Sequence, residues 1–583
     1  MLLTKVADVL NDHGLTSPDL EMLRPNETQY TTLLMQPSGP ITANKQRIGA
    51  FDQASASAKG KTFLKLAVDS STHLAVTPEY FFPWSAISEV INEEIIPPED
   101  ALWVLGSESI NQHELENFKL AVRDRCLVIH EPLEALSTNR ELLSPVVLLF
   151  HATNLHQQKQ LVALIQFKIH PSRDKYFFEE SVLRQGSLVY QFEGINSPLT
   201  ATVIICADVF AFANLSIAEQ SAFTNQSTLI HIQLNPQPRN IAYRKYRTDT
   251  FQRDPSATNC HIVSLNWAHS IIQYENPEND GVSWHNIAGS TWYCPIEKCS
   301  FDDKVILPNH DLGLYYSYMK EIRHALLFHY DEAVFQLLTP KLVIYGSALM
   351  ANRNGPTAIE RYEWIGSSLN WVVGNNPPDS GFSDLIQTNG EAQVALSNVL
   401  LTKNVLNIER VLTLSAGVTF GGEKWYEARN IDSCQIDVDE VVNRITVVQD
   451  TTESAKVFRN NRLTPIITIN YELLNRTDTE WPPQVIGINN QAIITWKKTI
   501  PSFNVLTSDQ QPTLIVYLGE FPTEETLKNK SDMFYELLRK AGGPYQSRLC
   551  IMYREHGQIK FAQIDALTRF DDAMQNKTDI MSV

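Results

Sequence analysis

Three side chains that could do chemistry each close a short apolar segment in the first half of the chain. Glu79 follows Ala75-Val-Thr-Pro, Lys168 follows Leu-Ile-Gln-Phe, and Cys206 follows Ala201-Thr-Val-Ile-Ile. A carboxylate, an ammonium and a thiol are a base, an oxyanion-stabilising cation and a nucleophile, the groups that a covalent hydrolysis needs. Their order along one α/β region indicates a catalytic site more strongly than any one of them does.

The immediate surroundings of these residues fit such roles. The carboxylate of Glu79 should be partly desolvated, which raises its pKa and suits it to general-base catalysis, because the next residues are aromatic: Tyr80, Phe81, Phe82 and Trp84. Cys206 stands where a strand turns, beside backbone N–H groups that favour a thiolate. Taken alone, a buried cysteine is more often an inert small hydrophobic residue.

The elements that must position these residues follow a layered α/β pattern. Short apolar runs alternate with helix-like segments through residues 1–340, as in sheets buried on both faces. Residues 315–338 are expected to form one long amphipathic helix that joins two domains. Beyond residue 340 we expect a second α+β or α/β domain, with helices at 359–373 and 524–540.

Several short motifs occur in order between residues 28 and 310. They are Leu34-Met-Gln36, Pro78-Glu79, Lys168-Ile-His170, Ile205-Cys-Ala-Asp208, a segment from Arg247 to Asn266, and Ala288-Gly-Ser-Thr291. Together they resemble the motifs of the carbon–nitrogen hydrolase (nitrilase/amidase) superfamily. No single motif is specific, but the ordered set is. The resemblance implies a nitrilase-like four-layer αββα sandwich.

The same resemblance implies a role for each residue. Glu79 would take the thiol proton and later activate water, and Cys206 would attack the carbonyl or nitrile carbon to form a covalent thioester-type intermediate. Lys168 would stabilise the oxyanion together with a backbone N–H group. Substrate contacts are implied for Ala207, Tyr80 and Asn266. No metal and no organic cofactor is required.

Two departures from the family pattern concern the site. Many members carry a second glutamate shortly after the lysine, and matching that segment here puts Asp174 in its place, with Glu179 and Glu180 as the other candidates. The family's Arg-Phe-Pro-Glu after the cysteine motif is replaced by residues 209–213, Val-Phe-Ala-Phe-Ala. That region often shapes the entrance and the dimer contact in the family. A shorter carboxylate at position 174 would hold the substrate or Lys168 differently and would so affect activity or substrate range.

The expected organisation has four parts. They are an N-terminal extension (1–27), a nitrilase-like carbon–nitrogen hydrolase domain (28–314), a connecting helix (315–340) and a C-terminal α+β domain of unknown function (341–583). Family members commonly pair through helices next to the active site, so we expect a homodimer or larger homo-oligomer. The C-terminal domain is the expected contact for a protein partner.

Composition excludes several other classes of protein. No apolar run approaches the roughly 20 residues of a membrane helix, and a formal net charge of −18 argues against a nucleic-acid binder. Seven scattered cysteines and an acidic start without signal-peptide character predict a cytoplasmic protein. The basic stretch 239–247 is either a solvated helix face or an anion or partner patch.

Other motif interpretations fail on spacing. Cys294 and Cys299 are too far apart for a zinc pair and have no second pair to complete a site. The glycines at 417–422 lack the Gly-Lys-Ser/Thr of a phosphate-binding loop. The chain also lacks the Ser-Gly-Gly-x-Asp-Ser pattern of a nucleotide-using ligase that would consume ammonia.

The function predicted from the sequence is therefore a cysteine-dependent hydrolase of a non-peptide C–N bond in a small amide, carbamoyl compound or nitrile. One alternative is a catalytically silent or partner-activated nitrilase-like scaffold or sensor in a multiprotein assembly, such as an antiviral defence complex. Another is acyl transfer to an acceptor amine instead of water. The reactivity of Cys206 distinguishes the scaffold from the enzymes, and product analysis distinguishes the two reactions.

Overall fold

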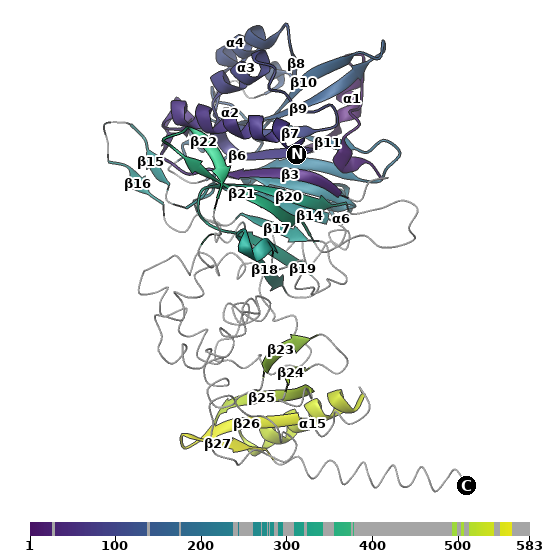
Figure 1. Ribbon diagram of the computed structural model, residues 1–583, viewed down its shortest axis with the longest axis vertical. Coiled ribbons are helices and arrows are strands. Elements are labelled where there is room, and N and C mark those ends of the chain that lie inside the picture. Colours follow the sequence, from purple (N-terminus) through teal and green to yellow (C-terminus); the bar gives the residue numbers. More distant parts are fainter. Residues whose placement is uncertain are drawn as a thin grey trace, which may run out of the picture. The chain divides into compact units, whose positions relative to one another are not determined.

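The computed structural model contains two compact units (Figure 1). The first unit comprises Met1–Ser317, Ile322–Ser380 and Val441–Asp450, and the second comprises Tyr318–Glu321, Gly381–Glu440 and Thr451–Val583. The structure describes residues 1–25, 29–136, 140–173, 177–236, 243, 260–269, 271–276, 278, 280–284, 290–294, 308–319, 323–341, 355–374, 377, 493–497, 503–506, 512–540 and 549–562.

The first unit contains a large mixed sheet that carries Glu79 and Lys168. Its ten strands run in the order β22 (Asn370–Val373), β21 (Thr357–Ile365), β20 (Ala333–Pro340), β3 (Gln29–Gln36), β6 (Leu74–Phe82), β7 (Leu102–Ser107), β9 (Pro145–Asn154), β10 (Lys159–Phe167) and β8 (Leu127–His130), and β2 (Leu15–Thr16) pairs with β9. All nine residues of β6 are buried. This burial explains its continuous apolar sequence, because both faces of the strand are covered.

A second sheet of the same unit carries Cys206. Its eight strands run in the order β1 (Leu2–Lys5), β11 (Leu188–Glu193), β12 (Thr200–Ile205), β13 (Ser227–Ile232), β14 (Cys260–Leu265), β17 (Thr291–Cys294), β19 (Arg323–Phe328) and β18 (Leu314–Met319). The central strands β12, β13 and β14 are parallel. Cys206 therefore follows the carboxyl end of a central parallel strand, where binding sites of α/β sheets are commonly found.

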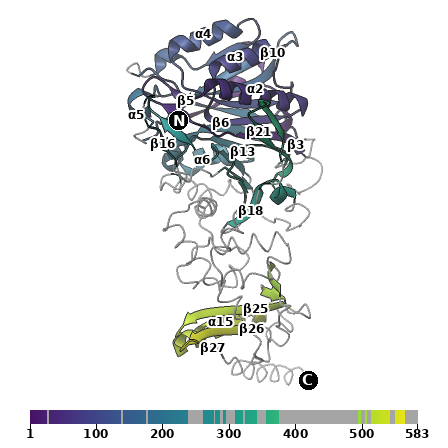
Figure 2. The same cartoon turned by 60° about the vertical axis from the view of Figure 1, so that its left-hand side comes forward.

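The two sheets pack face to face. The rings of Phe150 and Phe192 meet edge to face across the sheets at 5.2 Å, and Gln166 of β10 donates to the Val203 carbonyl of β12 at 3.0 Å. On the far face of the larger sheet lie α2 (Gln53–Asp69), α3 (Trp84–Asn92) and α4 (Gln112–Val122), as Figure 2 shows. Helix α6 (Ile217–Thr224) packs on the smaller sheet, which gives helix, sheet, sheet and helix layers.

The expected connecting helix at 315–340 is wrong, because this region forms the strands β18, β19 and β20. All eight residues of β20 pair antiparallel with β3. Seven of these eight residues are buried, so the apolar residues of β20 face both sides of the sheet and do not form one helical stripe. The helix expected at 359–373 is likewise the hairpin of β21 and β22. Both segments are rich in aromatic and β-branched residues, which favour a pleated surface.

The expected domain boundaries also change. Residues 1–27 are not an extension, because β1 pairs with β11 and β2 pairs with β9. At the other end, β21 and β22 continue the ten-stranded sheet past residue 341. The first unit thus includes the segments 1–25 and 355–374, which the sequence analysis placed outside the hydrolase domain, because their strands hydrogen-bond to its two large sheets.

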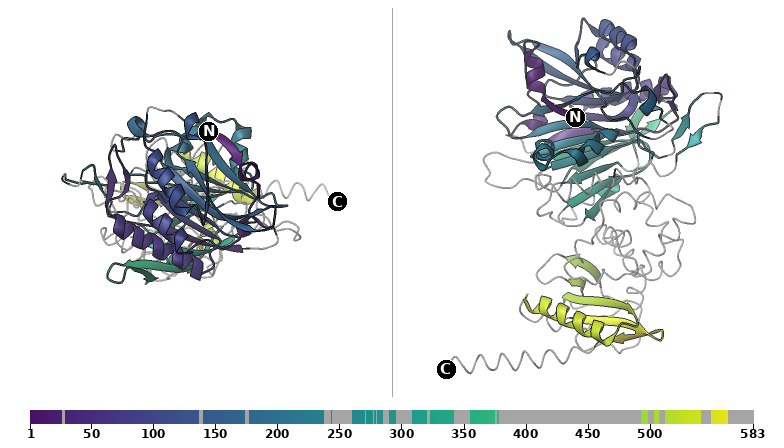
Figure 3. Two further views of the ribbon diagram at one scale, coloured as in Figure 1. Left: turned by 90° about the horizontal axis from the view of Figure 1, so that it is seen from above. Right: turned by 180° about the vertical axis from the view of Figure 1, so that it is seen from behind.

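The described part of the second unit is a five-stranded sheet with one helix. Its strands are β23 (Ile493–Lys497), β24 (Phe503–Leu506), β25 (Pro512–Glu520), β26 (Leu549–Glu555) and β27 (Gln558–Phe561). Helix α15 (Glu524–Lys540) lies between the parallel strands β25 and β26 in sequence, so the expected helix at 524–540 is confirmed. The apolar sequence pattern also favours strands at 434–448 and 466–471, and these segments lie outside the described residues. Figure 3 gives two further views.

Among the helices described, none has the length and apolar character to cross a membrane.

Candidate active site

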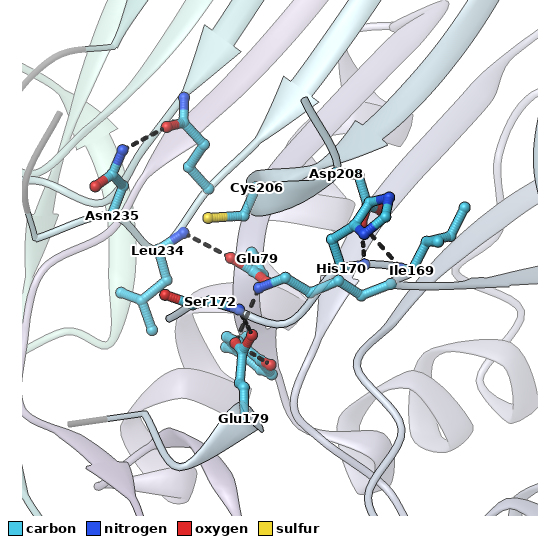
Figure 4. Close-up of polar contacts among 12 residues, drawn as sticks. Glu79, Ile169, His170, Ser172, Glu179, Cys206, Asp208, Leu234 and Asn235 are labelled. Carbon is cyan, nitrogen blue, oxygen red and sulfur yellow. Dashed lines mark hydrogen bonds and ion pairs between the residues drawn. The ribbon is translucent and has the colours of Figure 1, made fainter. Parts of the chain in front are cut away.

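Glu79 is presented by an irregularity in β6. The parallel pairing of β6 with β7 is interrupted between Thr77 and Phe82, and Tyr80 takes a left-handed backbone conformation with φ of 61°. Such a conformation is uncommon for a residue with a side chain and is held here by its surroundings. From this irregular segment the Glu79 carboxylate reaches Lys168 Nζ at 2.7 Å, and Figure 4 shows Glu79 with its neighbours Glu179 and Leu234.

A glycine on the neighbouring strand makes this irregular segment possible. A Cβ atom on Gly106 would lie 2.1 Å from the Pro78 carbonyl oxygen and 2.8 Å from the Glu79 nitrogen. We expect Gly106→Ala to displace this segment and to lower the free energy of unfolding by about 1–3 kcal/mol. Urea unfolding tests this, with Gly366→Ala as the control because its new Cβ meets nothing closer than 3.9 Å. Equal losses for the two variants would contradict the steric argument.

Lys168 lies between two buried carboxylates. Its Nζ is 2.7 Å from Glu79 Oε1 and 2.9 Å from Glu179 Oε1. Tyr80 donates its hydroxyl to Glu179 Oε1 at 2.8 Å, and the Ser172 N–H donates to Glu179 Oε2 at 2.5 Å. The Leu234 N–H donates to Glu79 Oε2 at 3.0 Å. Each oxygen of these two carboxylates thus has a donor, as buried charges require.

Burial controls the protonation of this cluster. Glu79, Lys168 and Glu179 are each no more than 1% exposed. Desolvation raises the pKa of Glu79 above its usual value, and the negative charge of Glu179 raises it further. Desolvation alone would lower the pKa of Lys168, but Glu179 and Glu79 outweigh it and hold that pKa well above its usual value. The cluster therefore combines a strengthened carboxylate base with a fixed ammonium.

Cys206 stands directly after β12 in a left-handed conformation, with φ of 39°. Its carbonyl oxygen lies 3.0 Å from His231 Nε2, a residue of the adjacent strand β13. Its Sγ lies 2.9 Å from the Tyr243 hydroxyl. Figure 4 shows Cys206 in the same site as Glu79 and Leu234. Desolvation and then the charge of Glu79 raise the pKa of Cys206 well above its usual value, so the resting group is a thiol.

Asp208 ties the segment after Lys168 to the segment after Cys206. Its Oδ1 accepts from the N–H groups of Ile169 at 2.9 Å and His170 at 2.7 Å. The carboxyl group is fully buried, and Oδ2 has no hydrogen-bond partner among the described residues. Burial raises the pKa of Asp208 to about 7. The two N–H groups and Lys168 oppose this rise, because they favour the ionised form. Asp208 is thus a structural link between the two strand ends.

The three expected substrate contacts lie in different settings. Tyr80 is engaged with Glu179, and Lys168 Nζ lies 5.7 Å from its ring centre. Asn266 Oδ1 accepts from the Asn235 and Trp267 N–H groups, and its Nδ2 donates to the Asn235 carbonyl. Asn266 thus fixes the backbone of Asn235. The residue before it, Leu234, donates its N–H to Glu79. Ala207 is buried beside Cys206.

The structure brings Glu79, Lys168 and Cys206 to one site, although they are far apart in the sequence. Asp174 lies outside the described residues, and the second carboxylate on Lys168 is Glu179, one of the two alternatives. Sequence reasoning did not single out His231 or Tyr243. A histidine inside the apolar strand 227–232 was a usable signal, whereas Tyr243 stood in a basic stretch that suggested a solvated face.

Within the described residues, no group of three or more histidine, cysteine, aspartate or glutamate side chains is arranged to hold a metal ion. Cys294 is buried in β17, and Cys299 lies outside the described residues.

Comparison with known proteins gives distant structural similarity. No protein-family model matches the chain, and no curated protein matches it by sequence. Similar solved structures include a glutamine-dependent NAD+ synthetase from Acinetobacter baumannii, at 12% identity and TM-score 0.27 over 71% of this chain and 58% of that chain. They also include an amidase from Nesterenkonia sp. (11%, TM-score 0.24, 42% and 79%) and a carbon-nitrogen hydrolase from Helicobacter pylori G27 (10%, TM-score 0.24, 42% and 75%).

Proposed function

We propose that the first unit is a cysteine-dependent hydrolase of a non-peptide C–N bond, with a nitrilase-like αββα architecture. The observation that carries the proposal is the buried cluster of Glu79, Lys168 and Glu179 beside a cysteine in a left-handed strand-end turn. Burying three charges is costly, and groups whose pKa values are perturbed in this way concentrate at functional sites.

In the proposed reaction, the Glu79 carboxylate takes the proton from Cys206 as the sulfur attacks the carbonyl carbon. The raised pKa of Glu79 makes its carboxylate a stronger base for this transfer. The S–C bond forms and the carbonyl oxygen becomes an oxyanion. Lys168 stabilises that oxyanion together with the backbone N–H of Ala207, and losing one such donor typically costs about 10²–10³-fold in rate.

The intermediate then collapses in two stages. Glu79 returns its proton to the departing nitrogen, which leaves as ammonia or an amine, and the acyl group remains on Cys206 as a thioester. Glu79 next takes a proton from water, whose oxygen attacks the thioester carbon. The carboxylic acid leaves and the proton returns to sulfur. The net reaction of an amide with water is therefore an acid plus ammonia, with no redox change.

The test is ammonia release by the full-length protein from a panel of small amides, ureas, carbamoyl compounds and nitriles. We expect release from one class, and Cys206→Ala should abolish it because the nucleophile is gone. Thermal unfolding of the variant checks that it stays folded. Release that persists in Cys206→Ala would refute the proposal. Acyl transfer to added hydroxylamine, measured in parallel, separates hydrolysis from transfer.

A further inference from the structure

A tyrosine hydroxyl lies on the proposed nucleophile itself. Tyr243 Oη is 2.9 Å from Cys206 Sγ, and the two residues are 7% and 2% exposed. Both groups can donate or accept, so the contact is satisfied in the resting thiol state. Water has little access to either atom at this level of burial.

The aromatic ring of Tyr243 is held from two sides. It meets the Phe210 ring edge to face at 4.9 Å between centres and lies nearly parallel to the His231 ring at 6.4 Å. His231 also contacts the Cys206 carbonyl oxygen. His231 therefore contacts both the Tyr243 ring and the backbone of Cys206, which fixes the Tyr243 hydroxyl relative to the sulfur.

We propose that Tyr243 is a further catalytic residue, whose hydroxyl donates a hydrogen bond to the Cys206 sulfur as the thiolate develops. This inference rests on the proposed function, because it assigns a role in activating the same nucleophile. When the S–H bond breaks, the proton passes to the Glu79 carboxylate and the electron pair stays on sulfur. A thiolate can only accept, so the Tyr243 O–H becomes the donor, and a hydrogen bond to an anion is stronger than a neutral one.

Tyr243 keeps its own proton in this step. Burial, followed by the neighbouring Cys206, raises the pKa of Tyr243 well above its usual value. The charged and titratable groups that act on the sulfur are Glu79 from β6, Lys168 after β10, Glu179 from α5 (Glu179–Val182) and Tyr243. Lys168 favours the thiolate and the two carboxylates oppose it. Tyr243 therefore adds a favourable contact without adding charge.

The experiment measures the rate of alkylation of Cys206 by iodoacetamide from pH 6 to 10, with peptide mass spectrometry to identify the cysteine. Tyr243→Phe keeps the ring and removes the hydroxyl. We expect its rate at pH 7 to fall about three- to tenfold and its profile to move to higher pH, as for the loss of one hydrogen bond to a charged group. Tyr190→Phe is the control, since Tyr190 is buried in β11 beside Glu131, and it should match the unsubstituted protein.

The possible outcomes separate the two proposals. A Tyr243→Phe rate that is unchanged, or higher at every pH, overturns the catalytic role, and the higher rate would make Tyr243 an obstruction over the thiol. If the Tyr243→Phe prediction fails in this way but Cys206→Ala abolishes ammonia release, the proposed function still stands. A Cys206 that is never alkylated, with ammonia release unaffected by Cys206→Ala, refutes both. A fall in hydrolytic kcat with little change in KM supports the catalytic role independently.

Discussion

Replacing Lys168 by methionine is expected to lower the free energy of unfolding by about 3–5 kcal/mol at pH 8. The substitution removes the ammonium that lies 2.7 Å from Glu79 and 2.9 Å from Glu179. Two carboxylates would then share a buried site without a counter-ion, and the energetic cost of an uncompensated buried charge is large. The same change removes the proposed oxyanion donor, so ammonia release should fall by at least about 10²-fold.

The destabilisation by Lys168→Met should depend on pH in a defined direction. Lys168 opposes the rise in the pKa of Glu79 that burial causes. Without the lysine the pKa of Glu79 rises further, so its carboxyl group can be neutral in the folded state at moderately low pH. Folding then takes up protons, and the stability of the variant falls as the pH rises. Urea unfolding at pH 5 and pH 8 should therefore show the larger loss at pH 8.

A second buried lysine provides a matched control for this experiment. Lys341 is 1% exposed and its Nζ lies 2.7 Å from Glu21 Oε1, outside the candidate site. Lys341→Met should destabilise the protein but leave the ammonia release of folded protein unchanged. A Lys168→Met protein as stable as the unsubstituted chain at both pH values would contradict the charge-cluster argument.

Replacing Asp208 by asparagine is expected to stabilise the protein above pH 7. Burial raises the pKa of Asp208 from its ordinary value of 3.8 to about 7. Its contribution to stability is therefore full below pH 4 and is lost as the pH rises from about 4 to about 7. Asparagine cannot ionise and keeps an oxygen that can accept from the Ile169 and His170 N–H groups. The gain at pH 8 is about 4 kcal/mol at most.

Urea unfolding at pH 5 and pH 8 tests this prediction, with Asp208→Ala beside Asp208→Asn. The alanine variant leaves the buried N–H of Ile169 and the partly buried N–H of His170 without their acceptor. The buried group alone costs about 1–3 kcal/mol, so this variant should be less stable than the unsubstituted protein at pH 5. A difference between the asparagine variant and the unsubstituted protein that does not grow with pH would show that Asp208 is ionised throughout.

The sequence by itself determined the elements that local patterning specifies. Apolar runs identified the buried strand that contains Glu79 and the strands that end just before Lys168 and Cys206, and motif order indicated that these residues belong to one site. Helix α15 was predictable because its charged and apolar residues alternate with helical spacing and glycines follow it. For each helix or strand, the information lies within its own short segment.

Only the tertiary structure decided where patterns were ambiguous or contacts were distant. The pattern of residues 315–340 predicts a helix, but the structure has three strands there. The last of them, β20, pairs with β3, which is about 300 residues away in the sequence. Glu179 was one of three candidate carboxylates until its oxygen was found on Lys168. Tyr243 and His231 reach Cys206 because separate segments fold over one turn. Hydrogen bonds between distant residues leave no periodic trace in a sequence, and so their geometry appears only when the sheets have assembled.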